Sequence, residues 1–335
     1  MSASQKTFPY SLGPVLEYTL KALKKYRSDQ HKLPSVAKNA SSKLRPLVVG
    51  ISGPQGLGKS TLAAALQTAL EAPQNGNLHV QRFSLDDVYL THQDQQELST
   101  NSNGNPLLRT RGQPGTHDLN LCVKMLDALC GASGRRVQVP IYDKAAYSGE
   151  GDREFEGNIP ETNSLEKETG YLDVVIFEGW CVGFQSLTAE DLSAGIRERL
   201  LGSARGSNKL FNLLAQHPEY LTSVNEHLAA YQAIWDYFDV FVHLDAGDIG
   251  WVYDWRLEQE HKLIAERGTG QSDEQVREFI NGYMSSYYLY VPRLRACNAR
   301  GPLVGKHVRA HIRLVVDKSR NIAHIINSEA DRERL

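Results

Sequence analysis

The chain has 335 residues and a formal net charge of −2, and 41% of its residues are hydrophobic. This near-neutral balance lacks the basic field of nucleic-acid and membrane-surface binders, so we expect neither partner. No apolar run approaches the roughly 20 residues that cross a bilayer. The four cysteines have no C-x-x-C spacing, which predicts reduced thiols rather than a zinc site or disulfides (Cys122, Cys130, Cys181 and Cys297).

The first segment predicts a helix followed by a linker. Apolar residues between 15 and 23 recur at helical spacing beside several lysines, which favours a helix docked on the surface. A targeting peptide is the alternative, but Glu17 and Asp29 interrupt the basic pattern. We therefore expect a cytoplasmic protein without organelle targeting, and a nuclear fraction is left open. Residues 32–45 are polar and contain Ser, Asn and Pro, as linkers do.

Strands then alternate with helices along the chain. The expected strands are 46–52, 79–85, 136–142, 171–180, 239–244 and 313–317, and the expected helices are 59–71, about 118–129, several within 186–236, about 248–266 and about 273–297. Residues 149–170 are rich in Gly and Glu and predict a solvated loop. The alternation predicts an α/β fold with a mostly parallel sheet between two helical layers.

The segment from Gly53 to Ser60 fits the pattern G-x-x-x-x-G-K-S/T in full, with a strand before it and a helix after it. Glycines let backbone N–H groups approach phosphate oxygens, and the helix N-terminus adds partial positive charge. The lysine reaches the β- and γ-phosphates, and the serine hydroxyl can ligate Mg²⁺. The predicted nucleotide-binding residues are Gly53, Pro54, Gln55, Gly56, Leu57, Gly58, Lys59, Ser60 and Thr61.

Glu178 stands at the end of a predicted buried strand, where ligands bind in open α/β sheets. We expect it to hold Mg²⁺ together with Ser60, although it could instead cap the next turn. A GTPase needs the base-reading motif N/T-K-x-D, and the nearest match, Asn208-Lys209-Leu210-Phe211, lacks the acid. The sequence therefore favours a kinase over a GTPase.

A kinase also needs a base for its acceptor hydroxyl. Asp86 and Asp87 follow the second strand and can serve, and helix capping or turn formation is the alternative. The loop from Arg109 to Asp118 packs two arginines, a histidine and an aspartate between Gly and Pro turns, which suits a small anion. Surface ion pairs are the alternative there.

Two features lie on the predicted C-terminal helices. Tyr253, Arg256 and Glu260 share one helix face, so Arg256 either neutralises charge on a transferring phosphoryl group or pairs with Glu260. Phe279, Tyr283, Tyr287 and Tyr290 recur at helical steps, which favours core packing over base stacking.

Six strings occur in a fixed order over about residues 50 to 290: SGPQGLGKST, SLDDVYLTH, RGQPGTHD, PIYDKAAYSGEGDR, FEGWCVGF and VYDWRLEQEH. Together they resemble the D-glycerate 3-kinase family and its fungal ATP-dependent relatives, within the wider uridine kinase, phosphoribulokinase and pantothenate kinase group. The resemblance implies a P-loop NTPase fold with a helical lid, ATP and Mg²⁺ as ligands, and phosphorylation of D-glycerate to 3-phosphoglycerate. It implies a small acidic substrate and a monomer or homodimer.

The resemblance also implies roles for single residues. Asp86 maps onto the base and Arg256 onto the lid arginine, with Lys59 on the transferring phosphoryl group. The acceptor site maps onto Asp87, Tyr89, Arg111, His117, Asp118 and Arg153. The expected organisation is an N-terminal helix and linker over 1–45 and a kinase domain over 46–335, with acceptor loops at about 104–160 and the lid at about 248–297.

The chain departs from the family pattern at three places. Val88 stands where the family often has Phe, Ala145 where it often has Ser, and Gly282-Tyr-Met-Ser285 where it often reads RYMP. These departures leave two alternatives open. The acceptor could be a nucleoside, pantothenate or another sugar acid, or the chain could be a nucleotide-binding regulatory protein with weak ATPase activity.

Overall fold

The computed structural model describes residues 11–31, 45–131, 139–154, 172–200, 208–297 and 304–327. The expected linker over 32–45 lies outside these residues except for Arg45, and so do most of the expected loop over 149–170 and the first part of the expected strand over 136–142. None of the described helices has both the length and the apolar character that a membrane span requires. The four cysteines are free thiols, as the sequence predicts.

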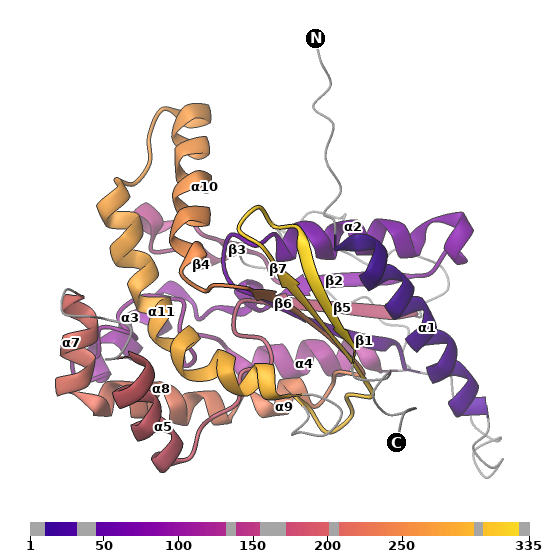
Figure 1. Cartoon of the computed structure of the whole chain (residues 1–335), viewed down its shortest axis with the longest axis horizontal. Coiled ribbons are helices and arrows are strands. Elements are labelled where there is room, and N and C mark those ends of the chain that lie inside the picture. Colours follow the sequence, from indigo (N-terminus) through magenta and orange to yellow (C-terminus); the bar gives the residue numbers. More distant parts are fainter. Residues whose placement is uncertain are drawn as a thin grey trace.

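A six-stranded sheet forms the centre of the molecule, with the strand order β2-β5-β1-β6-β7-β8 (Figure 1). The first five strands are parallel, and β8 joins the edge antiparallel to β7. The strands are β1 (Leu47–Ser52), β2 (Val80–Ser84), β5 (Val174–Gly179), β6 (Val240–Ala246), β7 (Ala310–Val316) and β8 (Ile322–Asn327). Every residue of β1, β5 and β6 is buried, as expected for parallel strands covered on both faces.

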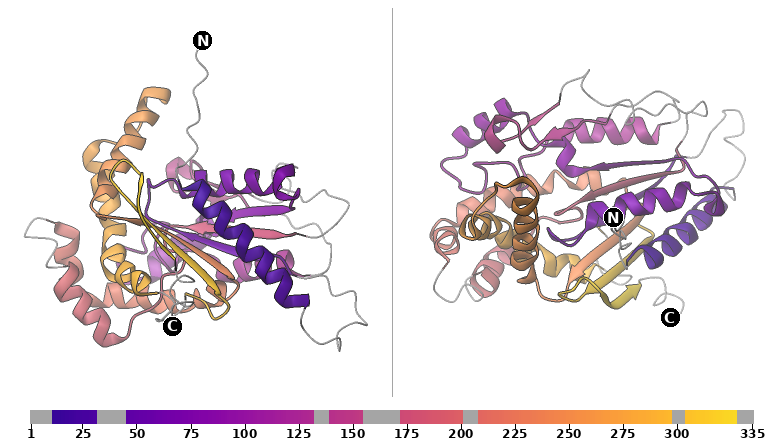
Figure 2. Two further views of the ribbon diagram at one scale, coloured as in Figure 1. Left: turned by 45° about the vertical axis from the view of Figure 1, so that its right-hand side comes forward. Right: turned by 90° about the horizontal axis from the view of Figure 1, so that it is seen from above.

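Helices cover both faces of this sheet (Figures 1 and 2). Helices α1 (Leu12–His31) and α2 (Lys59–Glu71) lie on one face, and α4 (Leu119–Cys130) and α9 (Gln232–Trp235) lie on the other. This arrangement confirms the predicted three-layer α/β fold. Helix α1 buries Val15, Tyr18, Leu23 and Tyr26, so it is docked on the body of the protein.

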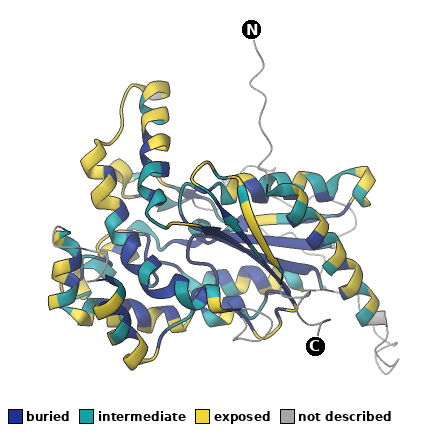
Figure 3. Cartoon of the chain, in the orientation of Figure 1, coloured by how far each residue is buried: buried dark blue, intermediate teal, exposed yellow. Residues whose placement is uncertain are grey.

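The remaining helices gather at the end of the sheet where the parallel strands terminate. They are α3 (His92–Asn101), α5 (Ala189–Gly195), α7 (Lys209–Gln216), α8 (Pro218–Ala229), α10 (Trp251–Arg267) and α11 (Asp273–Ala296). Helix α11 begins with the predicted capping box between Ser272 and Gln275. Helix α10 and the first turns of α11 project from the body side by side, and their outer turns are exposed (Figure 3). The rest of α11 packs against the body and buries Tyr287, Tyr290 and Leu294. Helices α10 and α11 occupy the range predicted for the lid.

Two expectations about strands were wrong. The described part of the run 136–142, residues 139–142, adds no strand to the central sheet. Its last residue instead begins β3 (Tyr142–Asp143), which pairs with β4 (Asp152–Arg153) in a separate hairpin. Part of the loop expected over 149–170 therefore forms the second strand of this hairpin. Strand β8 was not predicted from the sequence, and its middle residues are exposed at the sheet edge. An exposed edge strand lacks the continuous apolar pattern of a buried one.

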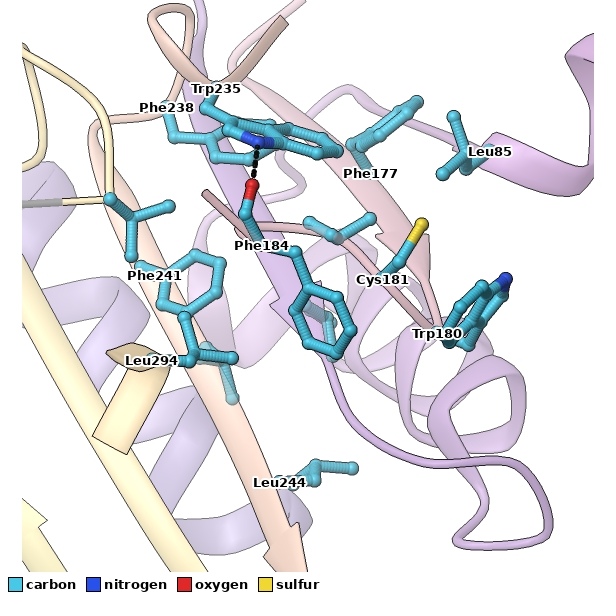
Figure 4. Packing of buried hydrophobic residues seen from close by; sticks show 14 of the residues in the cluster. Leu85, Phe177, Trp180, Cys181, Phe184, Trp235, Phe238, Phe241, Leu244 and Leu294 are labelled. Carbon is cyan, nitrogen blue, oxygen red and sulfur yellow. Dashed lines mark hydrogen bonds between the residues drawn. The ribbon is translucent and has the colours of Figure 1, made fainter. Parts of the chain in front are cut away.

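The core beneath the site is aromatic (Figure 4). The Phe238 ring packs against the rings of Phe177, Trp235 and Phe241. Trp235 donates its indole N–H to the Phe184 carbonyl at 2.8 Å. This bond gives the buried indole its polar partner. Tyr283, Tyr287 and Tyr290 are also buried, which confirms core packing for three of the four aromatic residues predicted to share this helix face, whereas Phe279 is 40% exposed.

Gly50 tests how tightly this core is packed, because a Cβ at its position would lie 2.7 Å from the Phe238 ring. We expect Gly50→Ala to lower the free energy of unfolding by about 1–3 kcal/mol through overpacking. The matched control is Gly13→Ala on α1, where a Cβ meets nothing within 4 Å and a gain of up to about 1 kcal/mol is expected. Urea unfolding of both variants measures the difference, and equal stabilities would contradict the prediction.

Candidate active site

The glycine loop joins β1 to α2 with the geometry of a phosphate-binding loop. Gly56 and Gly58 adopt left-handed φ values of 79° and 90°. At Gly56 a Cβ would lie 2.6 Å from the Cβ of Trp255, so the first turns of α10 press directly on the loop. Arg320 donates to the Gly56 carbonyl at 2.9 Å and pairs with Glu258 of α10 at 2.7 Å. The loop is thereby clamped between the lid and the turn after β7.

Lys59 carries an incompletely neutralised charge beside this loop. Its Nζ donates to the Pro54 carbonyl at 3.2 Å. Burial lowers the pKa of Lys59, and the nearby carboxylates of Glu178 and Asp86 offset this only in part. A phosphate group would supply the missing negative charge. The loop and its lysine therefore fit a nucleoside triphosphate.

The two predicted metal ligands lie together at the end of β5. The Ser60 hydroxyl donates to Oε1 of the buried Glu178 at 2.7 Å. Hydroxyl and carboxylate oxygens are ligands that Mg²⁺ prefers, and Mg²⁺ usually takes one or two protein ligands beside phosphate oxygens and water. Within the described residues, no cluster of three or more His, Cys, Asp or Glu side chains could hold a metal ion. The pair thus fits Mg²⁺ bound together with a nucleotide.

The adjacent carboxylates of Asp86 and Asp87 have different hydrogen-bond partners. They lie on a short 3-10 turn, Leu85–Val88, directly after β2. Asp87 accepts from the Ser84 backbone N–H at 2.8 Å and completes a capping box, so it shapes the turn. Asp86 instead receives the Lys144 ammonium on Oδ2 at 2.5 Å. The capping role that the sequence left open is therefore taken by Asp87, whereas the Asp86 carboxylate does not cap this turn.

Asp86 is held ionised. Burial alone would raise the pKa of Asp86, but its ion pair with Lys144 and the charge of Lys59 bring that pKa below its usual value. Tyr89 is buried next to it, and burial together with the Asp86 charge raises the pKa of Tyr89 well above 10. A deprotonated carboxylate beside a neutral phenol can accept a proton from a bound hydroxyl group.

His117 lies in the same pocket and is neutral, because burial lowers its pKa to about 3. Its ring stacks on Tyr89 at 4.3 Å, and its Nδ1 is 2.6 Å from the Tyr231 hydroxyl. That hydroxyl accepts from the Gly115 N–H, which leaves its own O–H to donate to Nδ1. The imidazole proton then resides on Nε2, which has no hydrogen-bond partner among the described residues. His117 thus offers a buried donor close to Asp86.

The other residues predicted to bind the acceptor already hold neighbouring backbone and side chains. Arg111 donates to the carbonyls of Lys144 at 3.3 Å, Gly149 at 2.8 Å, and Glu150. Asp118 caps α4 through the Leu121 N–H at 2.9 Å, and its second oxygen pairs with Arg153 at 2.9 Å. These three residues shape the β3–β4 hairpin and fix it against the site.

Arg256 lies on α10 near the P-loop, next to Trp255. Its guanidinium donates to Gln259 at 2.8 Å, lies 3.9 Å from the Glu260 carboxylate and stands 6.0 Å from the Phe279 ring. Arg256, Asp86 and Arg111 all influence the pKa of Tyr283, which burial raises. Arg256 therefore lies at the border of the pocket. It also forms the pair with Glu260 that the sequence offered as the alternative.

Several contacts within the site were not predicted from the sequence. They join α11 to the P-loop and to the loop from Arg109 to Asp118, and they join Trp180 to that second loop. Gln113 donates to the Gly282 carbonyl at 2.9 Å and accepts from Ser286 at 2.6 Å. The Tyr287 hydroxyl accepts from the Gln55 N–H in the P-loop at 3.1 Å. Trp180 donates to the Gly112 carbonyl at 3.0 Å. The stripe of tyrosines on α11 was the signal in the sequence, although it indicated only burial.

Asp87 provides a pH test of this arrangement. Burial raises the pKa of Asp87 to about 6, whereas an unfolded aspartate titrates near 4. The folded state therefore binds the proton more tightly, so Asp87 lowers stability as the pH rises from about 4 to about 6. We expect the stability of wild type relative to Asp87→Asn to fall by about 1–2 kcal/mol over this interval in urea unfolding. A difference that stays constant with pH would contradict this assignment.

Comparisons with known proteins agree with this geometry. No family model matches the chain. The "Uncharacterized kinase mug58" of Schizosaccharomyces pombe is 42% identical over 278 residues, which cover 82% of this chain and 90% of the relative. The chloroplastic D-glycerate 3-kinase of Arabidopsis thaliana is 36% identical over 279 residues, which cover 82% of this chain but only 54% of that longer protein.

A solved structure shows the same fold. The D-glycerate 3-kinase from Cryptococcus neoformans superposes with a TM-score of 0.78 at 36% identity, and the match covers 94% of this chain and 98% of that one. The sequence similarity covers 90% of the Schizosaccharomyces pombe relative, and the shared fold covers 98% of the Cryptococcus protein. The chain therefore belongs to the D-glycerate 3-kinase family of P-loop kinases and is a phosphotransferase.

Proposed function

We propose that the protein transfers the γ-phosphoryl group of Mg-ATP to the 3-hydroxyl of D-glycerate. The observation that carries this proposal is the position of Asp86, an ionised carboxylate that lies within electrostatic reach of the P-loop lysine. The fungal relative of matching length and fold bears the name D-glycerate 3-kinase. A nucleotide-binding regulator would have no need of a carboxylate placed beside the phosphate-binding loop.

The nucleotide binds in the loop from Gly53 to Thr61. Backbone N–H groups of the loop and the α2 N-terminus face the phosphates, and Lys59 neutralises charge on the transferring group. Ser60 and Glu178 hold the metal ion. When bound, Mg²⁺ neutralises charge on the phosphate oxygens.

Asp86 serves as the base. Its carboxylate accepts the proton of the glycerate hydroxyl as the oxygen attacks the γ-phosphorus. The bond to the β-phosphate oxygen breaks, and ADP leaves with that electron pair. The neutral His117 donates its Nε2–H to the acceptor, which orients it. Arg256 faces the phosphoryl group from the lid.

The direct test of this proposal is an acceptor screen. The purified protein is given Mg-ATP with D-glycerate, L-glycerate, uridine or pantothenate, and ADP formation is followed. We expect strong stimulation by D-glycerate alone and 3-phosphoglycerate as the product. Stimulation by another acceptor would move the protein to a different substrate within this kinase family, and no stimulation by any of them, with ATP still bound, would overturn the proposal.

A second test separates the two adjacent aspartates. Asp86→Asn keeps the shape of the side chain but removes the base, so kcat should fall by about 10²–10⁴-fold. Binding of ATP, measured by calorimetry, should change little because Asp86 lies outside the loop. Asp87→Asn is the matched control, because its side-chain oxygen can still accept from Ser84, and it should keep most of the activity. Equal losses in the two variants would argue against Asp86 as the base.

A further inference from the structure

Lys144 holds the proposed base from the solvent side. Its ammonium lies 2.5 Å from Oδ2 of Asp86, and its side chain is 58% exposed whereas that of Asp86 is 29% exposed. Lys144 follows β3 in the hairpin that covers the site. The long side chain can therefore change partner without any rearrangement of the core.

The neighbouring cations have other partners. The guanidinium of Arg111 is directed at three backbone carbonyls, and that of Arg153 at the Asp118 carboxylate. Lys59 lies in the phosphate-binding loop. Arg111 also fixes the backbone of Lys144, because it donates to the Lys144 carbonyl at 3.3 Å. An acidic acceptor bound at Asp86 would therefore meet Lys144, whose backbone is fixed by Arg111 and whose side-chain ammonium can move.

The ion pair also limits Asp86 as a base. Oδ2 is occupied by the ammonium, and the pairing lowers the affinity of the carboxylate for a proton. A bound hydroxyl that donates to Oδ2 must compete with Lys144 for that oxygen. An acceptor that draws the ammonium away would remove this competition.

We propose that Lys144 is the receptor for the acceptor's carboxylate and that its transfer from Asp86 to that carboxylate frees Asp86 to act. The inference rests on the proposed function and assigns the selectivity of the same site. The hydroxyl proton then passes to Oδ2 of Asp86, the oxygen forms the new bond to phosphorus, and ADP leaves with the electrons of the broken bond. A neutral acceptor lacks the charge that draws Lys144 away, so the site selects acids.

The experiment compares D-glycerate with its neutral amide, D-glyceramide, in the wild type and in Lys144→Met. Loss of the charge-assisted contact should lower kcat/KM for D-glycerate by about 100-fold. Activity with D-glyceramide should be unchanged or higher, because Asp86 is released from its ion pair. Lys144→Arg keeps the charge and should retain most of the preference for the acid. Lys124→Met, at an exposed position on α4, is the matched control and should behave as the wild type.

Calorimetry gives a second readout that does not depend on turnover. With a non-hydrolysable ATP analogue bound, D-glycerate should bind about 100-fold more weakly to Lys144→Met than to the wild type. Binding of the analogue itself and the melting temperature should stay the same.

The outcomes distinguish the two proposals. If the wild type uses D-glycerate and Lys144→Met keeps both its affinity and its preference for the acid, the role of Lys144 is wrong and the proposed function stands. If the wild type neither binds nor phosphorylates D-glycerate, both proposals fall together.

Discussion

The site depends on one constraint, which is that charged groups must be brought out of water at the edge where the parallel strands end. A phosphate-transfer enzyme needs such a region because electrostatic interactions are stronger where water is excluded. The two carboxylates are therefore given partners, because Glu178 is bonded to Ser60 and Asp86 is paired with Lys144. Lys59 donates to the Pro54 carbonyl and has no direct contact with an anion among the described residues. A bound nucleotide completes this set by supplying the negative charge that Lys59 lacks.

The surrounding fold keeps this arrangement in place. The buried Tyr287 on α11 accepts a hydrogen bond from the Gln55 N–H, a polar contact that adds no charge. Tyr287 bonds to the P-loop and Gln113 bonds to α11, so the lid, the phosphate loop and the acceptor loop form one connected structure. Movement of α10 and α11 would therefore change the geometry of both the P-loop and the loop from Arg109 to Asp118. Gly282 and Ser285, where the chain departs from the family pattern, lie in this connection, and Gly282 contributes only a backbone carbonyl to it.

The central elements could be predicted from the sequence because their signals are local. A phosphate loop between a strand and a helix is recognisable from Gly53 to Ser60, and buried strands such as Val174–Gly179 are continuous apolar runs. The strand expected over 136–142 failed because an apolar run does not reveal its partner, and Tyr142 pairs with a neighbouring hairpin strand. The division of labour between Asp86 and Asp87 depends on which one reaches back to Ser84, and the pairing of Lys144 with Asp86 joins residues far apart in sequence. Such contacts follow from the tertiary fold and have no local pattern.

The most direct measurement is a crystal structure of the Asp86→Asn variant with Mg²⁺, a non-hydrolysable ATP analogue and D-glycerate bound. The substitution stops turnover while it preserves the size of the side chain. The account predicts that the 3-hydroxyl oxygen lies within hydrogen-bond distance of the side chain at position 86 and faces the γ-phosphorus. An acceptor bound with its 3-hydroxyl away from position 86, while the γ-phosphate lies against Lys59, would contradict it.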